Sequence, residues 1–197
     1  FGTLSNNDYP NQTIGGLTRS VKITNLGLKY TRSLTSRFSA DASLSRVGID
    51  PDSPLQASSS SFGYLFSLNY TPPTRFSASV NASRNASSSP NTGTALYFVQ
   101  NAFALDLAYK VNSTLSATLV ASTSKRTYED ELGSNLPTPP ANQLQSDRFN
   151  RARLSLNWQP IRNTMASFYV SQQNRNAVPN IYNYKDTTAG IVISYGI

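Results

Sequence analysis

The sequence predicts an all-β fold made of antiparallel hairpins, and three observations support this prediction. First, a stretch that alternates apolar and polar residues and ends in an aromatic residue recurs as LGLKY, FSLNY, LDLAY, LSLNW and IVISY. Second, each of the first four stretches is followed, after a short gap, by another alternating run: RFSA twice, TLSA and TMAS. Third, the connections between runs alternate between short and long. Strict alternation places successive side chains on opposite faces of a strand, and a fixed repeat indicates one architecture used throughout.

The first two predicted hairpins pair strand 21–32 with strand 36–48 and strand 61–71 with strand 74–86. LGLKY lies in the first strand, and RFSA opens the second across a connection at about 33–35. FSLNY lies near the end of the third strand, where Pro72 and Pro73 follow. Proline ends strand pairing because it has no amide hydrogen to donate. A second RFSA then opens strand 74–86.

The remaining predicted strands cover about 95–111, 113–127, 147–158, 164–176 and 187–197. LDLAY, LSLNW and IVISY lie in the first, third and fifth of these, and TLSA and TMAS open their partners. Short connections are expected at 111–113 and 159–163. Long connections rich in Ser, Asn, Pro and Asp are expected at about 49–60, 87–94, 128–146 and 177–186.

Length and composition favour a membrane location for these strands. Charged residues are 14% of the 197 residues, whereas about 25% is typical of a soluble domain. The sequence has no run of about 18 apolar residues, so no membrane helix is predicted. Most of the expected strands have about 10 residues or more, enough to cross a bilayer. Short turns alternating with long loops are typical of outer-membrane barrels. We therefore expect residues 21–197 to form the hairpins of an antiparallel up-and-down transmembrane β-barrel.

Aromatic residues recur beside the short connections and predict a girdle at one membrane interface. The alternative is ordinary edge packing in a soluble β-sandwich. The predicted girdle consists of Tyr30, Phe38, Tyr70, Phe76, Tyr109, Trp158 and Tyr195.

The N-terminal residues 1–20 are expected to form an extracellular loop or an N-terminal extension, and 1–18 are interpreted as loop rather than strand. About nine strands are predicted, whereas single-chain bacterial barrels have an even number. The first predicted strand runs toward the short-turn side, so at least one strand should precede it. We therefore expect this chain to be the C-terminal part of a larger barrel, or to lack an N-terminal segment.

Alternation also assigns charged residues to a face, because a charge facing lipid at the bilayer midplane costs about 2–4 kcal/mol. Strand 164–176 is ambiguous, since either Met165 or the set Ala166, Phe168 and Val170 could face outward, and Arg175 is left unassigned. The acidic residues expected in the lumen are Asp41 and Asp106. The basic residues expected there are Lys29, Arg37, Arg75, Lys110, Arg126, Arg151 and Arg153.

A basic lumen has two interpretations. It can be a selectivity surface for anions, including acidic polymers. Alternatively, its basic residues pair with acidic residues on strands outside this chain, or contact a plug.

The absence of several motifs argues against other functions. The chain has no His and no Cys, and it carries no nucleotide-binding loop or zinc spacing. No enzymatic activity, cofactor or metal is predicted. Glu129, Asp130 and Glu131 could bind Ca²⁺, although a solvated loop tip is the commoner explanation. Nucleic-acid binding is not predicted, because the basic residues alternate along separate strands and do not form one patch.

The repeat of Leu-x-Leu-x-Tyr, a short turn and Phe/Leu-Ser-Ala resembles bacterial outer-membrane barrels of the β-barrel porin type. Similar repeats occur in outer-membrane proteins of exopolysaccharide-export systems. The resemblance covers the chain from about residue 20, and it implies an outer-membrane pore or export conduit for anionic solutes or polysaccharide. Its expected partners are outer-membrane lipid and other envelope proteins or barrel strands. The alternative is a non-conducting structural or partner-binding subunit of an envelope assembly.

Overall fold

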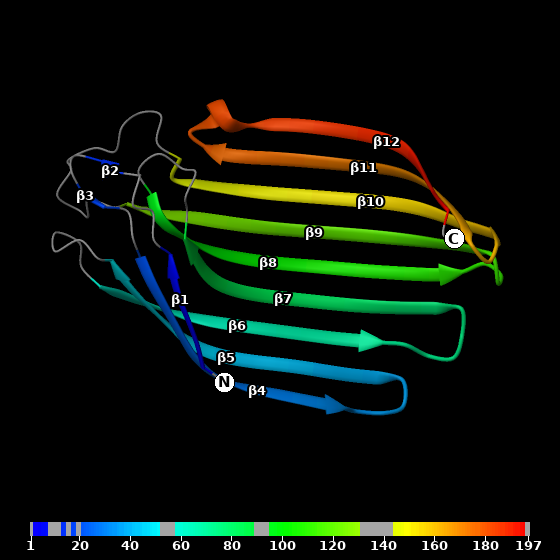
Figure 1. Cartoon of the computed structure of the whole chain (residues 1–197), viewed down its shortest axis with the longest axis horizontal. Coiled ribbons are helices and arrows are strands. Elements are labelled where there is room, and N and C mark those ends of the chain that lie inside the picture. The colour runs from blue at the N-terminus through cyan, green and yellow to red at the C-terminus, as the bar shows by residue number, and fades with distance from the viewer. Residues whose placement is uncertain are drawn as a thin grey trace.

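The computed structural model describes residues 2–7, 13–14, 17–18, 21–51, 58–88, 95–130 and 144–195, and most of them lie in one antiparallel β-sheet. Nine of its strands follow one another in chain order, each paired with the next (Figure 1). They are β4 (Val21–Ser33), β5 (Phe38–Pro51), β6 (Ser59–Tyr70), β7 (Phe76–Ser88), β8 (Ala95–Lys110), β9 (Leu115–Asp130), β10 (Ser146–Ile161), β11 (Thr164–Val178) and β12 (Tyr184–Tyr195). The prediction of an all-β, antiparallel, up-and-down fold is confirmed.

The nine strands correspond one to one with the nine predicted from the alternating pattern. The clearest difference is at the last short connection, where a turn over 159–163 was expected. Strand β10 continues to Ile161, and its register shifts between Trp158 and Ile161. This irregularity accommodates Pro160 within the strand, as bulges commonly do. The connection itself is reduced to Arg162 and Asn163.

The expectation that residues 1–18 contain no strand is wrong for Gly2–Asn7, which forms strand β1. Strand β1 pairs antiparallel with β4, from Gly2 opposite Leu26 to Asn7 opposite Val21. The sequence pattern missed it because the ladder along β4 stabilises a segment whose own residues have low strand propensity. The sheet therefore has ten strands, with β1 and β12 at its edges. A separate hairpin joins β2 (Thr13–Ile14) to β3 (Leu17–Thr18).

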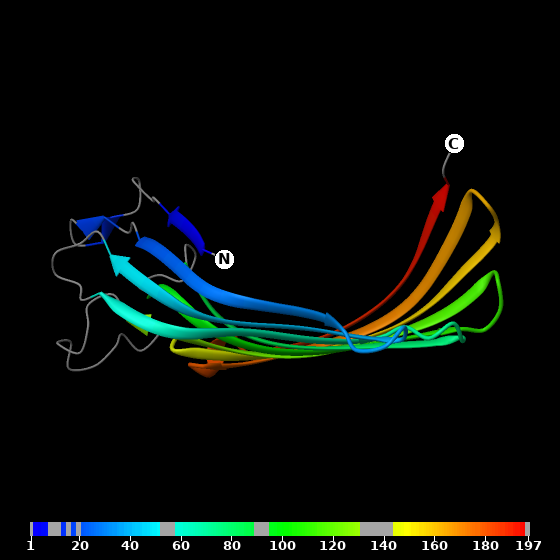
Figure 2. The same cartoon turned by 90° about the horizontal axis from the view of Figure 1, so that it is seen from below.

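The sheet is not closed within the described residues, since β1 and β12 each have one neighbour. Seen edge-on, it is a single curved layer (Figure 2). The described helical structure is the 3₁₀ turn η2 (Asn180–Tyr182), between β11 and β12. No helix in the described ranges is long and apolar enough to cross a membrane. Residues 52–57, 89–94 and 131–143 of the long loops lie outside the described residues, and Glu131 is among them.

The register separates the side chains into two faces, because residues directly opposite each other in a ladder point to the same side. One unbroken row runs from Phe38 through Tyr70, Ala78, Leu107, Leu119, Leu154 and Val170 to Ala189. We call this side the apolar face and the opposite side the polar face. The row resolves the ambiguity in strand 164–176, because Ala166, Phe168 and Val170 share the apolar face and Met165 lies on the other.

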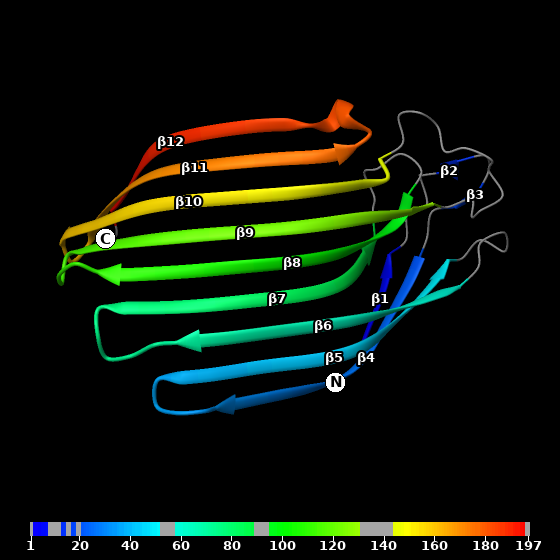
Figure 3. The same cartoon turned by 180° about the vertical axis from the view of Figure 1, so that it is seen from behind.

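The short turns are staggered from strand to strand. Strand β5 begins at Phe38, but Ala189 of its row lies six residues before β12 ends at Tyr195. Over the seven steps from β5 to β12, this is an offset of about 20 Å along the strands against about 34 Å across them. The strands are thus tilted by about 30° from the perpendicular to the line of short turns, close to the tilt of barrel strands. Figure 3 shows the same order of strands from behind.

The small buried core lies at the long-loop end, opposite the short turns. Pairing between β6 and β7 ends at Tyr64 and Arg84, whereas β4 and β5 stay paired as far as Val21 and Pro51. Ile23, Val47 and Ile49 are almost completely buried there, against Ala86 and Tyr97. Elsewhere the sheet is one layer, so most of its apolar side chains remain exposed.

Candidate functional site

The candidate site is the polar face, which carries most of the charged residues that the sequence assigned to a lumen. Lys29, Asp41, Asp106, Lys110, Arg126, Arg151 and Arg153 all share this face by register. The rest of the face is largely Ser, Thr, Asn, Ala and Gly. Ser39, Ser77, Ser116 and Ser155 lie on it by register.

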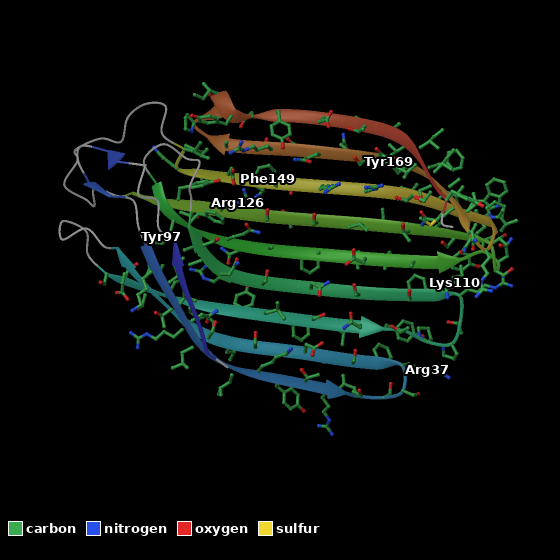
Figure 4. The ribbon with its side chains drawn as sticks, in the orientation of Figure 1. Arg37, Tyr97, Lys110, Arg126, Phe149 and Tyr169 are labelled. Carbon is green, nitrogen blue, oxygen red and sulfur yellow. The ribbon has the colours of Figure 1, made fainter. Side chains whose placement is uncertain are left out.

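Arg37 and Arg75 lie in short turns, one residue before β5 and β7 begin. Their carbonyl oxygens accept hydrogen bonds from the amides of Thr71 and Lys110, at 2.8 and 2.7 Å. The strand pairing therefore continues through both turn residues. By the alternation of the strand that follows, both belong to the polar face. Figure 4 shows Arg37 and Lys110 at the short-turn end of the sheet.

The two acidic residues expected in the lumen are held by hydroxyl groups. Asp41 Oδ1 accepts a hydrogen bond from Thr31 Oγ1 at 2.7 Å. Asp106 Oδ2 accepts one from Ser79 Oγ at 3.1 Å. Neither forms an ion pair with a basic residue in the described ranges, so the short-turn half of the face keeps an excess of positive charge.

Near the long-loop end the polar face carries a packed group of charged and aromatic residues, which we call the Arg–aromatic cluster. The Arg126 guanidinium lies 5.2 Å from the ring centre of Phe98 and 5.0 Å from that of Phe149. Its Nε donates to Gln100 Oε1 at 2.9 Å. Arg126 and Phe149 lie side by side in Figure 4. The full cluster is Phe98, Gln100, Arg126, Tyr128, Asp147, Phe149, Arg175 and Tyr184.

A buried ion pair anchors this cluster. Arg175 Nη2 lies 2.7 Å from Asp147 Oδ2, and the Asp147 side chain is 0% exposed. Tyr128 Oη also donates to Asp147 Oδ2, at 3.2 Å. The Arg175 guanidinium also packs against an aromatic ring, because it lies 5.0 Å from the ring centre of Phe149. Arg175, which the sequence left unassigned, is therefore a polar-face residue fixed by an acid on the neighbouring strand.

The sequence analysis missed Asp147 and Phe149, although the signal was present. Both have the same phase on β10 as Arg151 and Arg153. The pairing with Arg175 could not be predicted, because it depends on the register between β10 and β11, which places Phe149 opposite Arg175.

A second stacked arrangement lies nearer the middle of the face. The Arg153 guanidinium is 4.1 Å from the ring centre of Tyr169, and its Nε donates to Ser155 Oγ at 3.2 Å. Tyr169 stands directly opposite Gly190 of β12. A Cβ atom on Gly190 would lie 2.6 Å from the Tyr169 hydroxyl oxygen, so the ring lies across the glycine.

The expected aromatic girdle lies on the other face, along the short-turn edge. Its members share the apolar face by register, and the rings of Phe38 and Tyr70 are 4.5 Å apart between centroids. Most of the seven are exposed, including Tyr195 at 71% and Tyr30 at 56%.

The basic residues of the polar face can attract anions. In the described ranges no three or more carboxylate side chains come together to form a metal site. The chain matches no protein-family model, and no curated protein matches it significantly.

Proposed function

We propose that this chain is part of a bacterial outer-membrane β-barrel that forms a pore or export conduit for anionic solutes or acidic polysaccharide. The observation that carries the proposal is the band of apolar residues on one face of the nine strands, with small polar and charged residues at the opposite phase. One face is a continuous apolar surface, and the other is polar with a basic excess.

The exposure of the apolar face supports the membrane location. Leu28 is 82% exposed, Ile193 72% and Leu154 58%. Soluble monomers rarely expose a contiguous apolar patch larger than a few hundred Å². On β5, for example, this face is apolar from Phe38 to its first charged residue, Arg46. That stretch is about 26 Å along the strand, or about 23 Å after the tilt, close to the apolar band of outer-membrane barrels.

The conduit function rests on the basic excess of the polar face. In a barrel with this face inward, Arg37, Arg75, Arg151 and Arg153 would line the route. Charged rings select ions of the opposite sign. Each charge is screened within about 8–10 Å at physiological salt, so a test needs more than one replacement.

The test is the reversal potential of the reconstituted protein in a planar bilayer under a potassium chloride gradient. We expect anion preference in the parent and a lower preference in the double variant Arg37→Ser/Arg75→Ser. Both residues lie outside the strands, so the sheet should be unaffected. Arg32→Ser is the matched control, since Arg32 is at the same end of the sheet but on the apolar face, and its selectivity should equal the parent's.

The outcomes separate the parts of the proposal. Conductance with unchanged selectivity in the double variant would keep the pore and remove the role of those two arginines. Absence of conductance from correctly inserted protein would remove the conduit.

One observation favours a second function, a non-conducting barrel subunit that binds a partner or a plug. The Arg–aromatic cluster packs the polar face near the long loops, and Asp147 is fully buried within it. Packing of this kind is typical of a filled lumen. Insertion into bilayers without any conductance would support this second function.

A further inference from the structure

The apolar face of β8–β12 changes in polarity over three neighbouring rows of residues. The row nearest the long loops contains Lys125 opposite Arg148. The next row toward the short turns contains Thr123 opposite Asn150, and Lys185 opposite Asn174. The third row is apolar on β8–β10, with Leu105 opposite Ala121 and Ala121 opposite Ala152, and it continues on β11 with Gln172. On β9 and β10, cations, neutral polar groups and apolar groups thus follow in the order found from the surface to the interior of a bilayer.

Lys125 and Arg148 form an unfavourable pair on their own. They are directly opposite each other on neighbouring strands, where Cβ atoms are about 4.5–5.5 Å apart, and like charges in this arrangement destabilise a sheet. Both side chains are exposed. Neither forms an ion pair in the part of the chain that the structure describes. An anion between them would turn this repulsion into attraction.

A groove lies directly beside this pair on the same face. Phe103, Leu105, Ala121, Ala152, Gln172 and Lys185 are among the residues that line it. Ala121 and Ala152 form its floor, because their short side chains leave a hollow between Leu105 and the Leu119–Leu154 pair of the next row. At its mouth Thr123 Oγ1 donates to Asn150 Oδ1 at 2.8 Å.

We propose that this groove and its basic rim bind one phosphate-bearing membrane lipid. The acyl chain lies over Ala121 and Ala152, and the headgroup phosphate contacts Lys125, Arg148 and Lys185. The argument is charge complementarity at the rim together with an apolar groove at the depth of an acyl chain. The inference rests on the proposed membrane location of the apolar face, but it is independent of whether the barrel conducts.

On strands β4–β7 the same face has basic residues, but none of them stands directly opposite another basic residue. Lys22 stands opposite the acid Asp50. Arg84 Nε donates to the Phe62 carbonyl, and its Nη1 donates to Asn101 Oδ1. Arg46 is opposite Leu26 and Phe62 and has no second cation beside it. A bound anion is therefore expected to be stabilised most strongly at the Lys125–Arg148 pair.

The experiment uses a fluorescent reporter at the groove in protein reconstituted into phosphatidylcholine bilayers. Trp158 is the single tryptophan of the chain, so Phe103→Trp in a Trp158→Phe background reports on the groove alone. Quenching by brominated phosphatidic acid is compared with quenching by brominated phosphatidylcholine. We expect about tenfold preference for phosphatidic acid, because each basic residue near a membrane surface contributes appreciably to anionic lipid binding.

Two variants and one matched control are made in this background. Lys125→Gln/Arg148→Gln should reduce the preference to about onefold, and Ala121→Leu/Ala152→Leu should reduce it by filling the groove. Arg46→Gln/Arg32→Gln removes two charges from the same face away from the groove, and it should leave the preference unchanged.

Each outcome decides a separate point. Equal quenching by both lipids would overturn the lipid site while leaving the membrane location in place. No quenching by either lipid would contradict the membrane location itself. Loss of the preference on adding inorganic phosphate, at matched ionic strength, would show a site for the free anion and overturn the assignment to lipid.

Discussion

At the scale of single residues, the polar face depends on small side chains that leave room for large ones. Tyr169 can lie across β12 because its direct partner there is Gly190. Arg153 then stacks on the tyrosine ring at 4.1 Å, and a guanidinium over an aromatic ring contributes about 0.5–2 kcal/mol. One glycine of β12 therefore supports the orientation of a basic residue of β10 on the same face.

This arrangement predicts the effect of replacing Gly190. In Gly190→Ala the new Cβ would lie 2.6 Å from both Cζ and the hydroxyl oxygen of Tyr169, so the ring must move and lose its contact with Arg153. We expect a loss of about 1–3 kcal/mol in the free energy of unfolding, as for other overpacked sites. Urea titration of the refolded protein in detergent measures it.

Gly48→Ala provides the control, because the nearest atoms to its new Cβ are 3.9 Å away. That variant should be as stable as the parent or slightly more stable, since alanine reduces the entropy of the unfolded chain. Equal destabilisation of both variants would show that the Tyr169 contact is unimportant.

At the scale of the strand, each element has one apolar and one polar side, and β9 illustrates it. Leu119 lies in the continuous apolar row, while Ser116 and Ser122 have the opposite phase. The pleat alone enforces this separation, because successive residues point to opposite sides. A shift of one residue in register would move every serine of this strand to the apolar face.

Cysteine labelling tests the orientation of β9 in a bilayer. The chain contains no Cys, so single replacements report without background. Ser116→Cys and Ser122→Cys should react readily with a membrane-impermeant maleimide, because water on the polar side allows the reactive thiolate to form. Leu119→Cys should react slowly. Comparable rates at all three positions would refute the assignment of faces.

At the scale of the whole molecule, the stagger of the short turns sets the inclination of the strands. It amounts to six residues between the row of Phe38 and the end of β12. A sheet without such an offset would close only with upright strands, whereas barrels require tilted ones. The free edges β1 and β12 are also suited to further pairing, because they leave unpaired backbone groups.

The inclination can be measured in oriented bilayers by polarised infrared spectroscopy of the amide I band. We expect an average strand tilt of about 30–40° from the membrane normal, from the observed stagger and the usual range for barrels. Strands parallel to the membrane plane would contradict insertion. A soluble sandwich would show no preferred orientation.

The amino-acid sequence by itself determined the nine strands β4–β12, most of the short turns and the two faces. Alternation is a local property, and strands such as β4 and β8 carry it over many residues, so their existence needs no knowledge of distant contacts. It also sufficed to put Leu28, Phe38 and Leu68 on one face and Ser39 and Ser77 on the other, as the register confirms. That the first of these faces contacts lipid remains a prediction.

The tertiary structure decided what depends on register between strands. Strand β1 forms because β4 offers it an unpaired edge, and no sequence pattern within Gly2–Asn7 predicts it. The pairing of Asp147 with Arg175 and the opposition of Lys125 to Arg148 arise from the alignment of β10 with its two neighbours. Alternation fixes the side on which a residue lies but not its position along the next strand. Charge pairs, stacked rings and the groove over Ala121 and Ala152 depend on that second coordinate.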